Sequence, residues 1–221
     1  MPTSDLHNIN PVLTVITNLN PKRMLDIGCG FGKYGMLLRE YLDVWHERLR
    51  KEEWITTIVG IEAFDGYQNP IHDYAYSKVH LGEAQSVLPT LGEFDLILIA
   101  DVIEHLEQLQ ARELVRECFK HSPVVVISTP ADFCPQTELC DNSYEVHRSL
   151  WTQKDFPAEV KVRTIRVVSC NLYVASREPL PDSIFELTDP IDYVYLRSRR
   201  KLGAVGLPLS LALRFLCRLL S

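Results

Sequence analysis

The sequence predicts an α/β fold with a doubly wound, seven-stranded sheet that is mostly parallel and has an antiparallel C-terminal hairpin strand. Three observations support this prediction. Short, nearly continuous apolar runs alternate with longer helical patterns over residues 23–130. A glycine-rich loop follows the first apolar run, and two further runs near residue 170 lie only a few residues apart. Buried parallel strands give unbroken apolar runs, and a short connection joins antiparallel strands.

The elements follow from these patterns in chain order. Residues 11–19 indicate a short helix before Pro21, and residues 33–51 and 102–121 have helical patterns. After Pro130 a polar loop leads to a short helix at 151–156. The predicted strands cover residues 23–28, 55–64, 77–82, 94–101, 122–130, 159–168 and 171–177, and the last two form the hairpin.

The composition restricts the class of protein. The chain has 221 residues, 46% of them hydrophobic and 24% charged, as expected for one soluble domain. A net charge of −6 makes nucleic acid an unlikely partner. Six cysteines without a C-x-x-C pair indicate neither a zinc site nor a disulfide framework. The N-terminus shows no secretory signal, so we expect a cytoplasmic protein.

The loop "LDIGCGFG" carries an acid, Asp26, ahead of Gly28, Gly30 and Gly32. It departs from the dinucleotide pattern G-x-G-x-x-G, because Lys33 stands where the last glycine is required. An acid at this point repels a pyrophosphate and suits an ammonium group. Glu62, at the end of the second strand, can accept both hydroxyls of a ribose. A ligand with an amino acid at one end and adenosine at the other, S-adenosylmethionine, satisfies both acids.

Residues 23 to about 177 resemble the class I S-adenosylmethionine-dependent methyltransferases, which have a Rossmann-like fold. The resemblance rests on "LDIGCGFG", "VGIEAF", "LGEAQ" and "FDLILIADVIEHLE", in order and at plausible spacing. It implies a methyltransferase domain at 1–177 and an extension with an amphipathic helix at 178–221. The cofactor-binding residues that it implies are Asp26, Gly28, Cys29, Gly30 and Gly32 around the methionine end, Glu62 and Ala63 at the ribose, Glu83 and Ala84 by the adenine, and Asp101 near the methionyl or substrate side.

Because the sulfonium is already a strong electrophile, such an enzyme needs mainly to make the acceptor nucleophilic, by a base or a metal. Asp101, Glu104 and His105 share one helical face by their spacing, and His147 precedes Trp151 by four residues. We predict Glu104, His105 and His147 as the catalytic residues. The alternative is structural: Glu104 caps the helix and His105 binds the cofactor loop. Tyr34, Asp65 and Tyr67 are expected to border the pocket as structural or ribose-adjacent residues.

A metal, Mg²⁺ or Mn²⁺, is a further possibility. The chain resembles in part the E-x-x-E-H motif plus a later histidine of small-RNA 3′-end 2′-O-methyltransferases and coenzyme Q-type O-methyltransferases. It departs from them at Asp101, where those enzymes have glutamate, and D-x-x-E-H is also common in metal-free methyltransferases. The metal ligands are therefore left open.

These features predict O-methylation of a small molecule, such as a sugar, a lipid-linked saccharide or a secondary metabolite. One alternative is a metal-dependent methyltransferase acting on RNA 3′ ends, and another is a non-catalytic cofactor-binding interaction module. The acceptor is expected to meet residues 1–20, 65–76 and 131–150, because loops build such pockets. The sequence does not indicate the oligomeric state.

The C-terminal tail has a polar stripe on a leucine-rich helical pattern over residues 207–221. The basic run "RSRRK" at 197–201 precedes it. Residues 197–221 could therefore contact an anionic membrane surface, which would make the protein peripheral on the membrane. The alternative is packing against its own domain or a second subunit.

Overall fold

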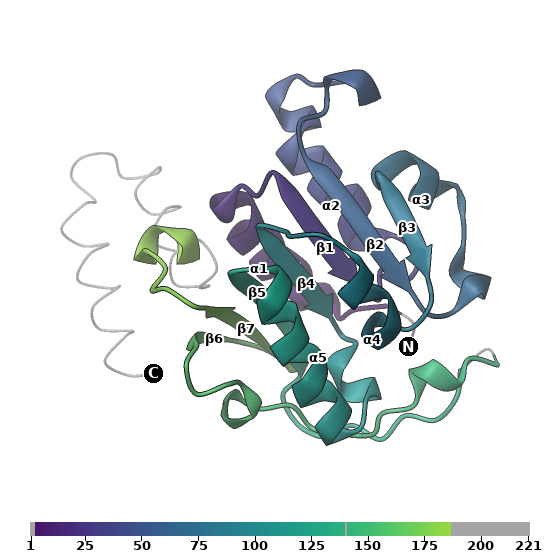
Figure 1. Cartoon of the computed structure of the whole chain (residues 1–221), viewed down its shortest axis with the longest axis vertical. Coiled ribbons are helices and arrows are strands. Elements are labelled where there is room, and N and C mark those ends of the chain that lie inside the picture. Colours follow the sequence, from purple (N-terminus) through teal and green to yellow (C-terminus); the bar gives the residue numbers. More distant parts are fainter. Residues whose placement is uncertain (1–2, 140, 187–221) are drawn as a thin grey trace.

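The computed structural model describes residues 3–139 and 141–186, which form a seven-stranded sheet with helices on both faces (Figure 1). The strand order is β3-β2-β1-β4-β5-β7-β6. The first five strands of the sequence run parallel, and β7 is antiparallel to both β5 and β6. The predicted fold class is confirmed. The strands are β1 Arg23–Ile27, β2 Thr57–Glu62, β3 Lys78–Leu81, β4 Leu96–Ala100, β5 Val124–Pro130, β6 Lys161–Val167 and β7 Cys170–Ser176.

Two apolar cores lie on the two faces of the sheet because alternate residues of a strand point to opposite sides. Met24 belongs to the core beneath α1, α2 and α3, whereas Leu25 and Ile27 belong to the core beneath α5. The α-helices are α1 Leu6–Leu19, α2 Lys33–Leu42, α3 Pro70–Ala75, α4 Ala84–Val87 and α5 Gln108–His121. The 3₁₀ turns are η1 Val44–His46, η2 Lys51–Glu53, η3 Asp65–Tyr67, η4 Leu88–Thr90, η5 Ile103–His105, η6 Ser143–Glu145, η7 Gln153–Asp155 and η8 Asp182–Phe185.

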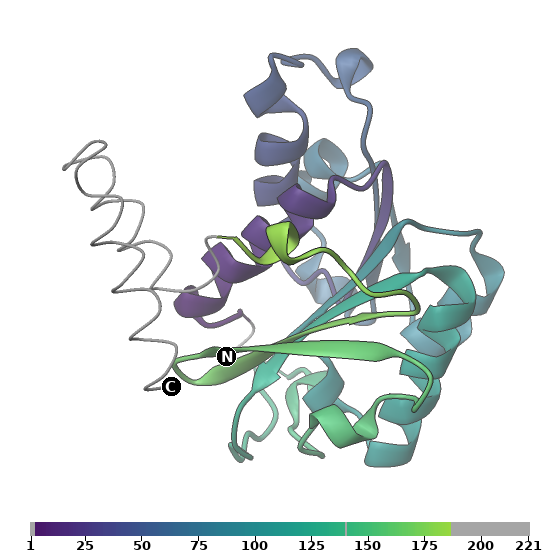
Figure 2. The same ribbon diagram turned by 90° about the vertical axis from the view of Figure 1, so that its left-hand side faces the viewer.

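Helix α2 ends at Leu42, so the prediction of a helix to residue 51 was wrong. The cause is Asp43, whose buried carboxylate accepts hydrogen bonds from Arg48 Nε at 2.8 Å and from the Ile55 N–H at 2.9 Å. It also accepts one from Arg39. These contacts turn the chain back towards β2. Residues 44–54 form the lobe that projects beyond the sheet (Figure 2).

The prediction of a continuous helix over 102–121 was also wrong. Residues 103–105 form the turn η5, and α5 begins at Gln108 after an extended Leu106. Glu107 caps α5, with its side chain and that of Gln110 forming a capping box. The break matters for the site because it takes Glu104 and His105 out of a regular helix.

Two helical features were not predicted. Helix α1 starts at Leu6 rather than near residue 11, because the Asp5 side chain accepts from the His7 N–H and caps the helix. Helix α3 follows Asn69, whose side chain accepts from the Ile71 N–H, with Pro70 in the first turn. Asparagine followed by proline is a signal for a helix start, and it was readable in the sequence.

The turn η8 packs against α1 (Figure 2), where Ile184 and Phe185 are buried in the core that α1 also lines. Asn18 Nδ2 donates to the Ile184 carbonyl at 3.0 Å. The division of the chain at residue 177 stays a prediction. The amphipathic helix expected at 207–221 and the basic run at 197–201 lie outside the described residues. Within residues 3–139 and 141–186, no helix combines the length and apolarity needed to span a bilayer.

Candidate active site

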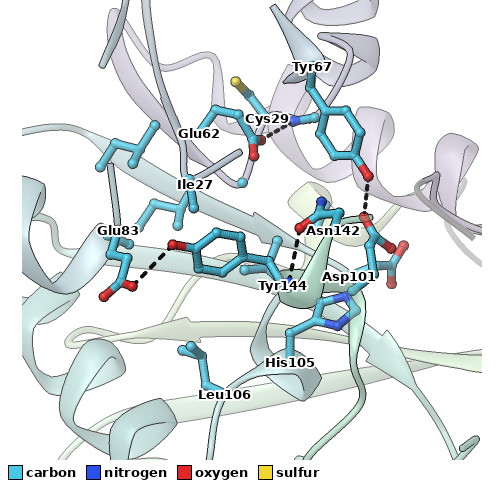
Figure 3. Close-up of a pocket in the computed structure, with 18 of the residues that line it drawn as sticks. Ile27, Cys29, Glu62, Tyr67, Glu83, Asp101, His105, Leu106, Asn142 and Tyr144 are labelled. Atoms are coloured by element: carbon cyan, nitrogen blue, oxygen red, sulfur yellow. Dashed lines mark hydrogen bonds between the residues drawn. The ribbon is translucent and has the colours of Figure 1, made fainter. Parts of the chain in front are cut away.

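A cavity of about 860 Å³ opens at the carboxyl ends of β1, β2 and β4 (Figure 3). In sheets of this kind ligands bind at this edge, where the strand order reverses. The lining includes the glycine loop, the ends of β2 and β3, the loop after β4, the N-terminal Thr3 and Ser4, and residues 142–145 with Arg148.

The glycine loop is tied down at its first glycine and open at its second. Gly28 N–H and Cys29 N–H both donate to the Ile61 carbonyl, at 2.8 and 3.1 Å. A Cβ on Gly28, whose φ is +69°, would lie 2.3 Å from Val102 Cγ2. A Cβ on Gly30, whose φ is +53°, would meet no atom within 4 Å. The backbone at Gly30 therefore borders open space, which a ligand can approach closely.

Glu62 is the last residue of β2 and contacts the glycine loop. Its Oε2 accepts from the Gly30 N–H at 2.7 Å and its Oε1 from the Phe64 N–H at 2.9 Å. Glu62 is only 6% exposed, and this burial raises the pKa of its carboxyl. Each carboxylate oxygen has a further lone pair for a ligand hydroxyl. Glu62 thus fixes the loop and still offers acceptors to the cavity.

Asp26 does not line the cavity, contrary to the expectation that it meets a ligand's ammonium group. Its carboxylate is fully buried on the α2 side of β1, where Tyr76 Oη donates to Oδ2 at 2.6 Å. Burial raises the pKa of Asp26 to about 7. The side chain of a strand residue two positions before the loop points into the core, so the charge argument placed it on the wrong side of the loop.

The far end of the cavity is apolar with a polar edge. Ala63, Ala84 and Leu106 line it beside Glu83. Tyr144 Oη donates to Glu83 Oε1 at 3.3 Å, so residues from the β5–β6 connection reach across to the end of β3. An adenine-sized ring suits such a slot, which has apolar walls and a few polar groups.

Residues 136–139 and 141–148, hereafter the strap, border the cavity through the segment 142–145 and Arg148. Tyr67 Oη donates to Glu145 Oε1 at 2.7 Å, and Gln136 Nε2 donates to the Glu145 carbonyl at 2.7 Å. Burial and the Glu145 carboxylate raise the pKa of Tyr67 to about 12. The Tyr67 ring also stacks on Phe31, with centroids 4.5 Å apart. The sequence placed an acceptor loop here but not Glu145, because no local pattern pairs it with Tyr67.

Two opposite charges, Lys33 and Asp101, line the cavity near the start of α2. Asp101 has a left-handed backbone, with φ of +52°, and its Oδ1 accepts from Ser128 Oγ at 3.2 Å. Within residues 3–139 and 141–186, its buried Oδ2 has no hydrogen-bond partner. Lys33 Nζ donates to the Ser4 carbonyl at 3.1 Å. The sequence named Lys33 only as a departure from a glycine pattern and missed its position.

Glu104, His105 and His147 lie together, with one ligand-type atom from each within 4.8 Å of the others. Glu104 is buried, accepts from Thr129 Oγ1 at 3.1 Å, and has its pKa raised by burial to about 8. Burial lowers the pKa of His105, and the neighbouring His147 adds to this effect. Of the three, only His105 borders the cavity.

A backbone carbonyl beside each imidazole favours one tautomer. His105 Nδ1 lies 3.3 Å from the Val146 carbonyl, and His147 Nδ1 lies 2.6 Å from the Cys134 carbonyl. A carbonyl can only accept, so each Nδ1 carries the proton and each Nε2 keeps its lone pair. Histidines that bind metals usually donate their other ring N–H in this way. Two imidazoles and one carboxylate are therefore a donor set that fits a divalent transition metal.

The structure brings most of the predicted site residues together. Those that line the cavity are Gly28, Cys29, Gly30, Glu62, Ala63, Glu83, Ala84, Asp101 and His105, and the expected border residues Tyr34 and Tyr67 join them. Those outside the lining are Asp26, Gly32, Glu104, His147 and Asp65. Gly32 still lies between two lining residues, Phe31 and Lys33, and Glu104 and His147 lie behind His105.

A family model described as a methyltransferase domain matches residues 7–163, which is well over half of the chain. Among curated proteins, the chain is 23% identical over 181 residues to ajmaline N-methyltransferase of Rauvolfia serpentina. The match covers 76% of this chain and 55% of that enzyme, so the chain spans about half the length of this relative.

Two solved structures have a similar fold. Monomeric WbdD matches with a TM-score of 0.57 at 18% identity, over 82% of this chain and 44% of that one. The methyltransferase domain of the bacterial CtHen1-C matches with a TM-score of 0.53 at 16% identity, over 78% of this chain and 98% of that one. At these identities the likeness concerns the fold.

Proposed function

The chain belongs to the methyltransferase-domain family, and from that premise we propose that it transfers the methyl group of S-adenosylmethionine to a hydroxyl oxygen of a small molecule. The cofactor lies along the cavity, with its ribose hydroxyls on Glu62 and its adenine between Ala63 and Leu106, beside Glu83 and Ala84. The open backbone at Gly30 supports this placement, because it lets the cofactor approach the loop.

The observation that supports oxygen as the acceptor atom is the position of His105 at the cavity. A hydroxyl is a weak nucleophile unless a base takes its proton, whereas a neutral amine needs no base. His105 borders the cavity, and its Nδ1–H contact with the Val146 carbonyl leaves the ring's lone pair on Nε2, which can accept a proton. As the acceptor oxygen attacks the methyl carbon, Nε2 takes the hydroxyl proton, the bond from carbon to sulfur breaks, and S-adenosylhomocysteine is released.

A small acceptor is supported by the net charge of −6, which disfavours long contacts with a phosphate backbone. The strap also favours a small molecule, because its Glu145 and Tyr144 line the cavity and are hydrogen-bonded to Tyr67 and Glu83 on the other walls. The acceptor we propose is a sugar, a lipid-linked saccharide or a secondary metabolite. The division into a domain at 1–177 and a C-terminal extension, with membrane contact through residues 197–221, is a separate part of the proposal.

The experiment is methyl transfer from radiolabelled S-adenosylmethionine to a panel of hydroxyl compounds, sugars and amines. We expect transfer to a hydroxyl compound, and a loss of about 10²–10⁴ in kcat for His105→Gln, the range for a general base. The matched control is His46→Gln, since His46 is exposed on the projecting lobe. Transfer to amines alone, with full activity of His105→Gln, would show that the acceptor is nitrogen.

The second candidate is a metal-dependent 2′-O-methyltransferase that acts on RNA 3′ ends. The observation that favours it is the Glu104, His105 and His147 cluster, whose Nε2 atoms and carboxylate would hold a divalent metal as a Lewis acid for the acceptor oxygens. The same assay, run with EDTA, with Mn²⁺ and with short RNA, separates the two. We expect activity on small molecules to survive EDTA, and activity that needs both Mn²⁺ and RNA would establish the second candidate.

A further inference from the structure

We propose that helix α3 and its N-cap position the glycine loop for the cofactor, with His72 holding the Gly30 carbonyl and Asn69 holding the Phe31 carbonyl. This inference deepens the proposed function and rests on it. Gly30 and Phe31 line the cavity, whereas His72 and Asn69 lie outside its lining. The two side chains therefore act through the loop, as positioning residues.

Gly30 is held at both of its backbone polar groups. Its N–H donates to Glu62 Oε2 at 2.7 Å, and its carbonyl lies 2.8 Å from His72 Nε2. Because a carbonyl can only accept, Nε2 carries the proton and donates. Two buried side chains, one from β2 and one from α3, thus fix the residue that borders open space in the cavity.

Asn69 makes the second contact with the loop. Its Oδ1 accepts from the Ile71 N–H at 2.9 Å and caps α3. Its Nδ2 donates to the Phe31 carbonyl at 3.2 Å and to the Tyr67 carbonyl at 2.9 Å. One side chain therefore joins the start of α3 to the glycine loop.

The two loop carbonyls lie ahead of the hydrogen bonds of α2. Those bonds begin at the Gly32 carbonyl, which accepts from the Met36 N–H at 2.9 Å. The Gly30 and Phe31 carbonyls precede it, and the side chains of His72 and Asn69 hold them instead. Glycine has the most conformational freedom to lose, so a loop that is fixed in advance binds a ligand more tightly.

The His72 ring is itself held in place. It is buried and packs edge to face on Tyr76, with ring centroids 5.8 Å apart. Tyr76 Oη accepts from the Gly35 N–H at 3.1 Å, one turn further along the chain. Asn69, His72 and Tyr76 stand at i, i+3 and i+7, the spacing of one helical face. That face contacts the loop and the first turn of α2 at three points.

The test compares His72→Met with His72→Gln. Both new side chains are unbranched and of equal length, but only glutamine has an N–H that can donate to the Gly30 carbonyl. Isothermal titration of S-adenosylhomocysteine into the intact protein and each variant measures affinity, and thermal melts without ligand show that each variant is folded. His46→Met is the matched control, since His46 is exposed on the projecting lobe.

We expect His72→Met to weaken S-adenosylhomocysteine by about three- to tenfold, as loss of one hydrogen bond predicts, and His72→Gln to bind within about twofold of the unaltered protein. Rescue by an uncharged side chain assigns the effect to the donated hydrogen bond and not to a charge near Glu62. A merely structural role of the ring gives no rescue, because both variants lose the contact with Tyr76.

Asn69→Ser tests the second contact. Serine and asparagine are equally good N-caps, so α3 keeps its cap, but the serine side chain is too short to reach the Phe31 carbonyl. We expect this variant also to weaken S-adenosylhomocysteine by about three- to tenfold, with a Tm close to that of the unaltered protein. If His72→Met does not fold, Asn69→Ser alone decides.

Equal affinity of His72→Met and His72→Gln would overturn this inference, and so would unchanged affinity of Asn69→Ser. Either result leaves the proposed function intact, because the unaltered protein still binds the ligand. If the unaltered protein does not bind S-adenosylhomocysteine, the proposed function fails and the inference with it.

Discussion

Tyr76 Oη donates a hydrogen bond of 2.6 Å to the Asp26 carboxylate and accepts one of 3.1 Å from the Gly35 N–H. One hydroxyl thus joins β1 to the first turn of α2 from below the glycine loop. Both side chains are almost fully buried. The acid that the sequence assigned to a ligand instead supports the loop that the ligand would meet.

The burial of Asp26 predicts a pH-dependent stability. Its pKa is about 7 in the folded protein, against 3.8 for an ordinary aspartate. Since the folded state holds this proton longer than the unfolded state, the contribution to stability is full below pH 3.8 and is lost as pH rises through about 7. Asp26→Asn keeps an acceptor for Tyr76 and does not ionise. We expect its unfolding free energy, relative to the unaltered protein, to rise by about 2–3 kcal/mol between pH 5 and pH 8.

Urea denaturation at several pH values measures this difference. The matched control is Asp95→Asn, on the exposed carboxyl that accepts from the Lys22 and Arg23 N–H groups outside the core. A difference between Asp26→Asn and the unaltered protein that does not change with pH would show that Asp26 titrates normally.

The first two glycines of the loop should respond differently to alanine. Both have a positive φ, so each substitution costs about 1–2 kcal/mol of backbone strain. Gly28→Ala adds a clash, because the new Cβ would lie 2.3 Å from Val102 Cγ2. Gly30→Ala meets open space and should fold, but its methyl group would occupy the volume assigned to the cofactor.

Thermal melts and titration with S-adenosylhomocysteine distinguish the two variants. We expect Gly28→Ala to lower Tm more than Gly30→Ala does, and Gly30→Ala to lose cofactor affinity while its Tm falls only as far as the backbone strain requires. Normal affinity of Gly30→Ala would place the cofactor away from the loop.

Strands β1, β2, β4 and β5 could be predicted from the sequence because each is a buried apolar run, and burial on both faces leaves little ambiguity. The last residue of α2 and the first residue of α5 could not be predicted. Helix α2 stops where Asp43 binds Arg48 and the Ile55 N–H, twelve residues further on, and no local pattern indicates that contact. The residues after β4 keep a helical spacing in sequence, yet Leu106 is extended.

The residues of the site also differ in whether the sequence could predict them. Gly28, Glu62 and His105 follow from motifs that a single stretch of sequence contains, and they line the cavity. The Tyr67 and Glu145 pair joins residues 78 positions apart, so only the fold brings it together. Asp26 was misplaced because a motif gives the order of residues and not the side of the sheet that each one faces.

The Asp43 contacts make a stability prediction. Asp43 is fully buried and accepts from Arg39, Arg48 and the Ile55 N–H. Asp43→Ala leaves the buried Arg39 guanidinium without its carboxylate, and breaking a buried ion pair in this way costs about 3–5 kcal/mol. Urea denaturation of Asp43→Ala beside Asp73→Ala, an exposed aspartate on α3, measures it. Equal stability of these two variants would contradict a structural role for Asp43.

The strap should control how fast the cofactor leaves. Tyr67→Phe keeps the ring on Phe31 and removes the hydroxyl that donates to Glu145 at 2.7 Å. Because that hydrogen bond is buried and ends on a carboxylate, its loss should favour the open strap by about 1–3 kcal/mol. We expect the dissociation rate of S-adenosylhomocysteine, measured by stopped flow, to rise about tenfold or more.

The matched variant is Tyr144→Phe, which removes the other tyrosine contact of the strap. Tyr144 is exposed and its hydroxyl lies 3.3 Å from Glu83, so this weaker contact should change the rate far less. The comparison separates a general loosening of the strap from the loss of one buried contact, since both variants lose one hydroxyl. Equal rates for the two variants would mean that the strap opens independently of Tyr67, and the cofactor would then leave by another side of the cavity.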